Sequence, residues 1–158
     1  MQMSEQALEL LKQWEGFETK VYNDSAGLPT IGVGHLITAS EQTSGAIVIT
    51  GLSVQYADGL TDQQVVDLLG QDVQPAEQAV NGGVQVALAQ NQFDALVSFT
   101  FNVGAGAFNS STLLKVLNQG HYDQVPDQLR RWNKAGGQVV KGLVTRRENE
   151  VKLWSGQI

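Results

Sequence analysis

Cysteine is absent from the 158 residues of this chain. Its absence excludes a disulfide framework, a thiol nucleophile and a cysteine-ligated zinc site. The chain also has no run of 18 apolar residues, and its first six residues lack the basic flank and apolar run of a signal peptide. We therefore expect a protein that is made in the cytoplasm and that has no stable insertion in a membrane.

Positive charge is also scarce, and it is unevenly placed. Ten basic residues face 16 acidic ones, and the resulting net charge of −6 argues against general nucleic-acid binding. Before Lys115 there are 12 acidic and 2 basic residues, whereas from Lys115 onward 8 basic residues face 4 acidic ones. This basic C-terminal part is either an ordinary solvated helical surface or a face that approaches an anionic polymer.

The remaining composition is that of one folded domain. Hydrophobic residues make up 42% and charged residues 16% of the chain, which excludes a disordered protein. A chain of this length buries a substantial core as a single domain over residues 1–158. We recognise no cofactor motif and no metal-ligand cluster, so we expect neither a cofactor nor a metal ion.

The N-terminal third changes from a helix to short strands. The apolar spacing over residues 4–15 predicts a helix with Ser4 as its N-cap, and Gly16 suits the left-handed position past its end. Residues 17–37 alternate and contain many turn residues, which predicts short antiparallel strands. Residues 38–60 predict an irregular extension of this small β region, with room for an extra hairpin.

The rest of the chain has helical periodicity. Thr61, followed by Gln64, predicts a capping box that opens a connecting helix over residues 61–82, bent or shortened at Pro75. Beyond residue 82 we expect helices throughout, over residues 90–102, 111–119, 123–134 and 143–154.

Three residues point to carbohydrate chemistry. Glu15 ends a helix, where the macrodipole disfavours a charged carboxylate and where partial burial would disfavour it further. Asp24 lies in a polar turn and Thr30 opens a Gly-interrupted strand. Two carboxylates in different settings, with a hydroxyl, are what hydrolysis of a glycosidic bond requires. By themselves, the three residues also fit a solvated helix end, an Asx turn and an ordinary strand position.

The surrounding motifs carry a stronger signal. The spacing Glu-x8-Asp-x5-Thr stands between Trp14-Glu15-Gly16 and the segment Thr30-Ile31-Gly32-Val33-Gly34-His35. With the segments 91–104, 108–114 and 142–147, it resembles the phage-type lysozymes, the T4 lysozyme family of glycoside hydrolases, over residues 8–155. Residues 38–60 are the part that does not match.

The resemblance implies a fold and an activity. The expected fold is α+β and predominantly helical, with a small β-containing lobe (residues 16–60), a larger helical lobe (residues 83–158) on which helix 4–15 packs, and a cleft between them. The implied activity is lysozyme activity: hydrolysis of the β-1,4 bond between N-acetylmuramic acid and N-acetylglucosamine in peptidoglycan, with inversion. The implied setting is host cell lysis by a monomeric endolysin that is made in the host cytoplasm and reaches the wall with the help of a holin.

The resemblance also assigns residue roles. Glu15 is the general acid, Asp24 the second carboxylate and Thr30 the hydroxyl that holds water. Arg146 orients Glu15, although Arg147 could substitute for it. The positions expected to touch the sugar chain are Leu36, Phe101 and Ser111, whereas the family's further Asn contact falls near Pro126 and is not preserved.

One histidine invites a catalytic role but fits a structural one. His35 follows Thr30 on the strand, and a carboxylate on the next helix, Asp72, is positioned to pair with it. We expect a structural ion pair between them.

Other activities remain open at this point. A lytic transglycosylase cleaves the same bond with only the acid, and retention of Asp24 and Thr30 speaks against it. An inactive peptidoglycan-binding module would be expected to lack a catalytic carboxylate, and a chitin-directed enzyme is a further alternative.

Overall fold

The computed structural model describes residues 1–158, and it divides into two compact units. One unit contains residues 8–72, and the other contains residues 1–7 and 73–158. The predicted α+β, predominantly helical class is confirmed. No helix has both the length and the apolar character needed to cross a membrane.

The first helix begins and ends where the sequence predicts. Helix α1 covers Glu5–Glu15, and Ser4 caps it because its Oγ accepts a hydrogen bond from the backbone N–H of Ala7 at 3.1 Å. Gly16 follows with φ 76°, a left-handed conformation that glycine adopts without a steric penalty. The backbone therefore turns sharply immediately after Glu15.

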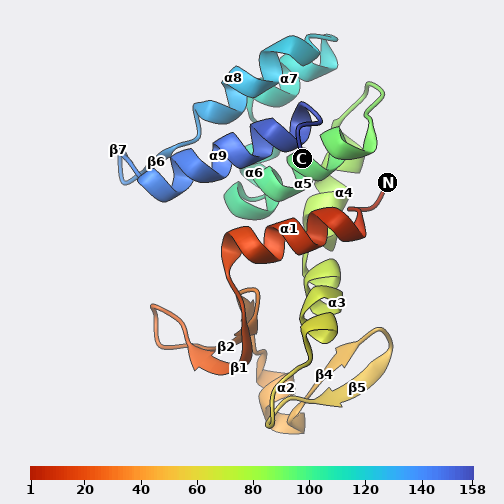
Figure 1. Ribbon diagram of the computed structural model, residues 1–158, viewed down its shortest axis with the longest axis vertical. Helices are drawn as coiled ribbons and strands as arrows, with labels where there is room; N and C mark the ends of the chain where they lie inside the picture. Colours follow the sequence, from red (N-terminus) through yellow and green to blue (C-terminus); the bar gives the residue numbers. More distant parts are fainter. The chain divides into compact units, whose positions relative to one another are not determined.

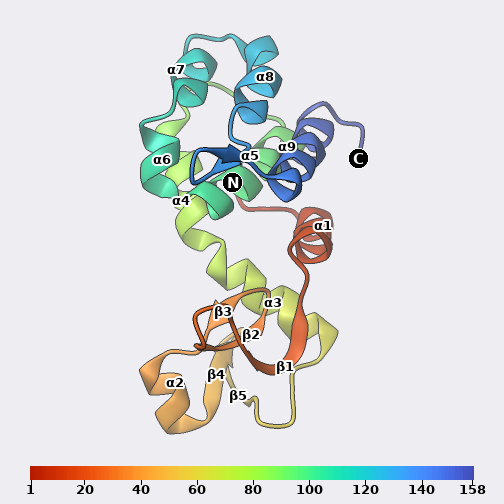
Figure 2. The same ribbon diagram turned by 90° about the vertical axis from the view of Figure 1, so that its left-hand side faces the viewer.

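The unit of residues 8–72 contains two small sheets and helix α3, as Figure 2 shows. Strands β1 (Glu18–Asn23), β2 (Pro29–Gly32) and β3 (His35–Leu36) form an antiparallel sheet in that order. Helix α3 (Asp62–Asp72) packs against β2, β3 and β4. It opens with the predicted capping box, since Thr61 and Gln64 exchange two hydrogen bonds of 2.9 and 3.1 Å.

Residues 38–60 contain a helix that the sequence did not predict, followed by the extra hairpin for which it left room. Helix α2 covers Ala39–Ser44, and the hairpin pairs β4 (Ala46–Ile49) with β5 (Leu52–Gln55). The buried side chains of Ile47 and Ile49 attach the hairpin to the core, because alternate residues of β4 face inward.

The expected connecting helix over residues 61–82 is two helices. Helix α3 ends at Asp72, and helix α4 covers Gln74–Gly83 with Pro75 in its first turn. Proline is tolerated there because the first N–H groups of a helix have no partner within it. The boundary between the two units falls at this break.

The unit of residues 1–7 and 73–158 is built around a buried helix. Helix α5 (Gln90–Val103) packs against α4, α6 and α9, and Phe93, Leu96 and Phe99 on it are fully buried. The helices that complete this unit are α6 (Ala105–Asn109), α7 (Thr112–Asn118), α8 (Val125–Arg130) and α9 (Lys141–Trp154), with a 3-10 turn at Tyr122–Gln124.

The expectation of helices throughout this region is wrong at one place. The helix expected over residues 123–134 ends at Arg130, and a hairpin of β6 (Lys134–Ala135) and β7 (Gln138–Val139) follows. Gly136 and Gly137 have φ values of 59° and 77°, which matches the two positive φ angles of a two-residue hairpin turn. Strands of two residues show no periodicity, so the apolar pattern could not reveal them.

Candidate active site

Glu15 is the last residue of α1, and its side chain is exposed. The partial burial expected for this carboxylate is therefore not seen, and the end of α1 places it at the negative end of the helix macrodipole. The last turn of α1 is attached to the following chain by Lys12, whose Nζ lies 4.4 Å from the ring centroid of Phe17 and 3.5 Å from Glu9 Oε2. A cation over an aromatic ring fixes this corner of the backbone.

Asp24 follows β1 and organises the turn between β1 and β2. Its Oδ1 accepts hydrogen bonds from the backbone N–H groups of Ala26 and Leu28, both at 2.9 Å. Its own N–H donates to the Leu28 carbonyl at 2.9 Å, and its carbonyl accepts from Gly27 N–H at 2.9 Å. Both turn bonds to the side chain use Oδ1, and Oδ2 takes no part in them. Asp24 can therefore form the Asx turn and still have a carboxylate oxygen for the role of second carboxylate.

Thr30 lies on β2 opposite Tyr22 of β1 and Leu36 of β3. Its side chain is buried, and its Oγ1–H donates to the Leu28 carbonyl at 2.9 Å. Since a hydroxyl has one proton and two lone pairs, this bond leaves Thr30 as an acceptor towards any further partner. Leu36, half exposed and directly opposite Thr30, is the one predicted sugar contact that the sheet register brings beside a predicted catalytic residue.

The main-chain N–H and C=O of Leu28 link Asp24 and Thr30. Its N–H donates to the Asp24 carboxylate, and its carbonyl accepts from both the Asp24 N–H and the Thr30 hydroxyl. This role of Leu28 could not be predicted from the sequence, because a main-chain group leaves no signal in residue type.

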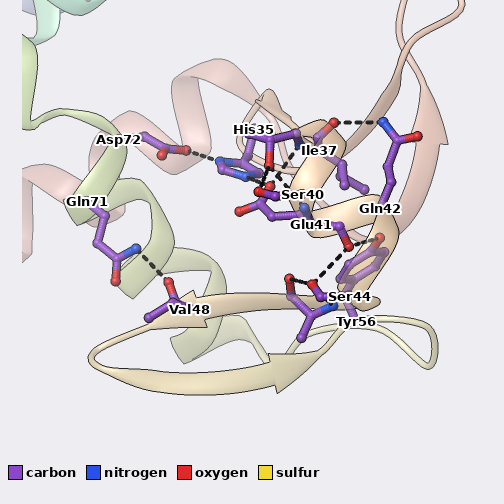
Figure 3. A network of polar contacts seen from close by, with 12 residues as sticks. His35, Ile37, Ser40, Glu41, Gln42, Ser44, Val48, Tyr56, Gln71 and Asp72 are labelled. Atoms are coloured by element: carbon purple, nitrogen blue, oxygen red, sulfur yellow. Dashed lines mark hydrogen bonds and ion pairs between the residues drawn. The ribbon is translucent and has the colours of Figure 1, made fainter.

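His35 lies between two carboxylates, and Figure 3 shows it in the network around α2. Its Nδ1 is 2.8 Å from Asp72 Oδ2, the expected partner, and its Nε2 is 2.9 Å from Glu41 Oε1. The hydrogen bond to Asp72 is the main cause that raises the pKa of His35 to about 9, and Glu41 adds to it against the effect of burial. His35 is therefore a charged structural residue over most of the neutral range.

Glu41 is a second partner of His35, and its role was not predicted from the sequence. It closes the capping box of α2, because its carboxylate accepts from Thr38 N–H at 2.9 Å while its own N–H donates to Thr38 Oγ1. Burial favours its neutral form, but the bonds from Thr38 and His35 outweigh it and lower the pKa of Glu41. The spacing Thr38-x-x-Glu41 is itself a capping-box signal that was present in the sequence.

Three predicted site residues belong to the other unit, and each is described within it. Ser111 is buried as the N-cap of α7: its Oγ accepts from Leu114 N–H at 3.1 Å and donates to the Phe108 carbonyl at 2.6 Å. Phe101 is half-buried near the end of α5. The Ser111 hydroxyl therefore already makes one hydrogen bond as a donor and one as an acceptor within the fold.

Arg146, the third of these residues, belongs to a buried ionic cluster on α9. Glu150 is fully buried, and its Oε2 lies 3.2 Å from Arg146 Nε while its Oε1 lies 2.7 Å from Arg147 Nε. Ser98 Oγ donates to Glu150 Oε2 at 2.6 Å, and Arg146 Nη2 donates to the Ser98 carbonyl at 2.9 Å. Arg147 in turn donates to Asn102 Oδ1 at 2.7 Å. The cluster gives the two arginines distinct, fixed positions.

Comparison with known proteins agrees with these observations. The family described as phage lysozyme matches residues 12–150. The endolysin of Bacillus phage PZA is 40% identical over 160 residues, which cover 98% of this chain but only 55% of that protein, so the chain spans about half the length of this curated relative.

Two solved structures extend the comparison. A mutant of P22 lysozyme superposes with a TM-score of 0.83 at 38% identity, over 98% of this chain and 99% of that one. The muramidase domain of SpmX from Asticaccaulis excentricus superposes with a TM-score of 0.77 at 32% identity, over 97% of both chains. With the lysozyme-like fold and the family match over most of its length, the chain belongs to the phage lysozyme family.

Proposed function

We propose that this protein is a muramidase that hydrolyses the β-1,4 bond between N-acetylmuramic acid and N-acetylglucosamine in peptidoglycan, with inversion. The observation that carries the proposal is that the main chain of Leu28 is hydrogen-bonded to both the Asp24 carboxylate and the Thr30 hydroxyl. The names endolysin, lysozyme and muramidase among its relatives support the same reaction class.

Glu15 acts as the general acid in this proposal. It donates its proton to the oxygen of the leaving sugar while the anomeric carbon gains oxocarbenium character. The C-terminal end of α1 disfavours the charged form of Glu15 and so favours the protonated form that the reaction needs.

Asp24 and Thr30 hold the attacking water. Because the Thr30 proton is used by the Leu28 carbonyl, the water donates one hydrogen to Thr30 Oγ1 and the other to Asp24 Oδ2. A water that donates both hydrogens directs its lone pairs away from these acceptors, towards the sugar carbon. Asp24 then takes up the proton as the C–O bond forms, and attack on the face opposite the leaving group inverts the anomeric centre.

Residues around the reacting groups have supporting roles. In this proposal Arg146 has the role of orienting Glu15 that the family resemblance gives it, and within its own unit the Glu150 carboxylate holds the Arg146 guanidinium in place. Leu36 and Phe101 provide apolar contacts to the sugar chain. Ser111 is the weakest member of this set, because its hydroxyl caps α7.

The products of wall digestion test the reaction. In water enriched in oxygen-18, hydrolysis puts one heavy oxygen at a reducing N-acetylmuramic acid end, whereas a transglycosylase releases 1,6-anhydro products without the label. Reducing, labelled muropeptides support the proposal, and anhydro products contradict it. No release from a peptidoglycan that a known muramidase digests would leave the binding-module alternative, and release from chitin alone would identify a chitinase.

A matched pair of variants tests the water-holding step. Thr30→Ser keeps the hydroxyl and its bond to the Leu28 carbonyl, while Thr30→Val keeps the shape and removes the acceptor. We expect Thr30→Ser to retain most activity and Thr30→Val to lose about 10²-fold, the lower end of a general acid–base contribution. Equal activities would remove Thr30 from the mechanism.

The biological setting follows the same proposal. The protein is made in the cytoplasm of a bacterial host as a monomer, requires a holin or a similar export route, and contributes to host cell lysis. Its partner is the glycan strand of peptidoglycan, without nucleic acid or a cofactor. Retention in the cytoplasm of holin-negative lysogens, measured by fractionation, would support this route.

A further inference from the structure

The segment of residues 128–147 contains six basic residues and no acidic residue. It runs from the end of α8 through the β6–β7 hairpin into α9, and it is bounded by Asp127 and Glu148. A chain with a net charge of −6 therefore concentrates more than half of its ten basic residues in twenty positions. The proposed reaction uses only one of them, Arg146.

Carboxylates neutralise three of the six. Arg130 lies 3.3 Å from Asp127 Oδ1 and 2.7 Å from Glu148 Oε1, and Glu150 lies between Arg146 and Arg147. These two groups of contacts account for the acidic residues that flank the segment.

The other three cations have exposed side chains and no carboxylate within 4.0 Å: Arg131, Lys134 and Lys141. The hairpin brings them together, because Lys134 pairs with Val139 and Val140 N–H donates to the Asn133 carbonyl at 2.9 Å. The pair of Asn133 and Val140 closes the base of the hairpin. Arg131 comes two residues before this pair, and Lys141 comes directly after it. Figure 1 shows the hairpin beside the N-terminal end of α9.

Apolar side chains accompany these charges. Val139 is 61% exposed, and Val140 and Val144 are each more than one-third exposed. An anionic membrane would call for larger apolar side chains that insert below the headgroups, and valines alone offer little such insertion. A polymer in which phosphates alternate with polyol or sugar units offers anions to the three cations and C–H groups to the valines.

We propose that Arg131, Lys134, Lys141 and Val139, here called the hairpin surface, form a docking site for a phosphodiester-linked polymer of the bacterial cell wall. The proposal rests on the proposed function only in placing the protein at the wall. The hairpin surface concentrates the protein on its insoluble substrate through charge, and it does so despite the net negative charge of the chain.

The test compares two triple variants with the same change of net charge, from −6 to −9. One is Arg131→Gln, Lys134→Gln and Lys141→Gln. The control neutralises three other exposed lysines that also have no carboxylate partner, as Lys20→Gln, Lys115→Gln and Lys152→Gln. Circular dichroism establishes that both are folded.

Binding is measured by co-sedimentation at 4 °C, in a Glu15→Gln background that limits digestion. The two insoluble preparations are walls that carry phosphodiester polymers and the same walls after hydrofluoric acid has removed them. We expect native walls to bind the parent protein about tenfold more tightly than stripped walls at low salt, because several exposed charge pairs each contribute modestly. That difference should shrink as salt rises towards 0.5 M.

The hairpin variant should lose the tenfold preference, and the control variant should keep it. Equal binding of native and stripped walls by the parent protein would overturn the proposal, as would equal losses in the two variants. Binding to vesicles of anionic lipid that exceeds binding to native walls would replace the polymer with a membrane. Because binding is read without turnover, failure of the muramidase reaction would leave these outcomes unchanged and would be seen separately, as an absence of released muropeptides.

Discussion

Substitution of Asp24 separates its structural role from its chemical one. Asp24→Asn keeps an oxygen that accepts the hydrogen bonds from Ala26 and Leu28, whereas Asp24→Ala removes both bonds. Each bond joins a backbone N–H to a half-buried carboxylate, and such bonds contribute about 0.5–1.5 kcal/mol each when exposure to solvent is taken into account. Asp24→Ala should therefore cost about 1–3 kcal/mol of unfolding free energy, and Asp24→Asn about 1 kcal/mol or less.

In thermal unfolding, a cost of 1 kcal/mol corresponds to roughly 2–4 °C for a chain of this size. We expect Asp24→Ala to lower the Tm by about 2–12 °C and Asp24→Asn by no more than about 4 °C. Activity should respond differently, because neither variant has a carboxylate to accept the proton from water. Both should lose at least about 10²-fold in the rate of muropeptide release from peptidoglycan.

Asp24→Asn is predicted to separate the loss of activity from the loss of Tm, and two results would contradict this prediction. Asp24→Asn with a tenth or more of the parent rate would show that no base is needed at this position. Asp24→Asn with the same loss of Tm as Asp24→Ala would show that the charge, rather than the acceptor geometry, holds the turn. Differential scanning calorimetry and a soluble muropeptide assay on the same preparations decide between these outcomes.

Three further predictions follow from other parts of the chain. Glu15→Gln should reduce muropeptide release by at least about 10²-fold with little change in Tm, because the amide has nearly the same shape but no acidic proton for the leaving oxygen; retention of a tenth of the activity would refute the assignment. His35→Ala should lower stability by about 2 kcal/mol near pH 6, where His35 is charged and Asp72 and Glu41 are ionised. The folded pKa of His35 is raised to about 9, so this contribution to stability is complete below pH 6.5 and disappears as the pH rises through about 9. An equal Tm difference at pH 6 and pH 10 would contradict the prediction, as would a double-mutant cycle that shows no coupling between His35 and Asp72. Thr50→Asn should raise the Tm by about 1–3 °C, because Thr50 has φ 51° in the β4–β5 turn and asparagine tolerates that conformation better; a lower Tm would mean that the Thr50 side chain matters more than its backbone.

Capping residues allowed the sequence to predict helix starts well. Ser4 and Thr61 both accept the hydrogen bonds that their spacing predicted, and Pro75 marks the break that shortens α3. The hairpin after Arg130 was missed because its strands are too short for a period-2 pattern, although Gly136-Gly137 was a turn signal. Helix α2 was missed although Thr38 and Glu41 carried a capping box.

The candidate site was predicted less evenly than the fold. Residue type and spacing identified two carboxylates and a hydroxyl, but their roles came from the resemblance to a family. The hydrogen bonds that link Asp24 and Thr30 are made by the Leu28 main chain, which is invisible to residue-based reasoning. The Arg146–Glu150 cluster was invisible for another reason: which charges are buried together depends on the packing of α5 against α9.

The proposed water-holding groups, Asp24 and Thr30, are held by hydrogen bonds between residues close in sequence, so few substitutions elsewhere should disturb them. Asp24, Leu28 and Thr30 span seven positions, and every hydrogen bond among them closes within the turn and strand that contain them. Their geometry therefore depends on formation of the β1–β2 pair, and not on any contact distant in sequence. Arg146 depends instead on Glu150 and on Ser98 of α5, 48 positions away. Under the proposed role of Arg146 towards Glu15, Glu150→Gln should change the pH dependence of turnover in the limb that reports the acid. Asp24→Asn should instead change the limb that reports the base, because the two substitutions act on separate hydrogen-bond networks.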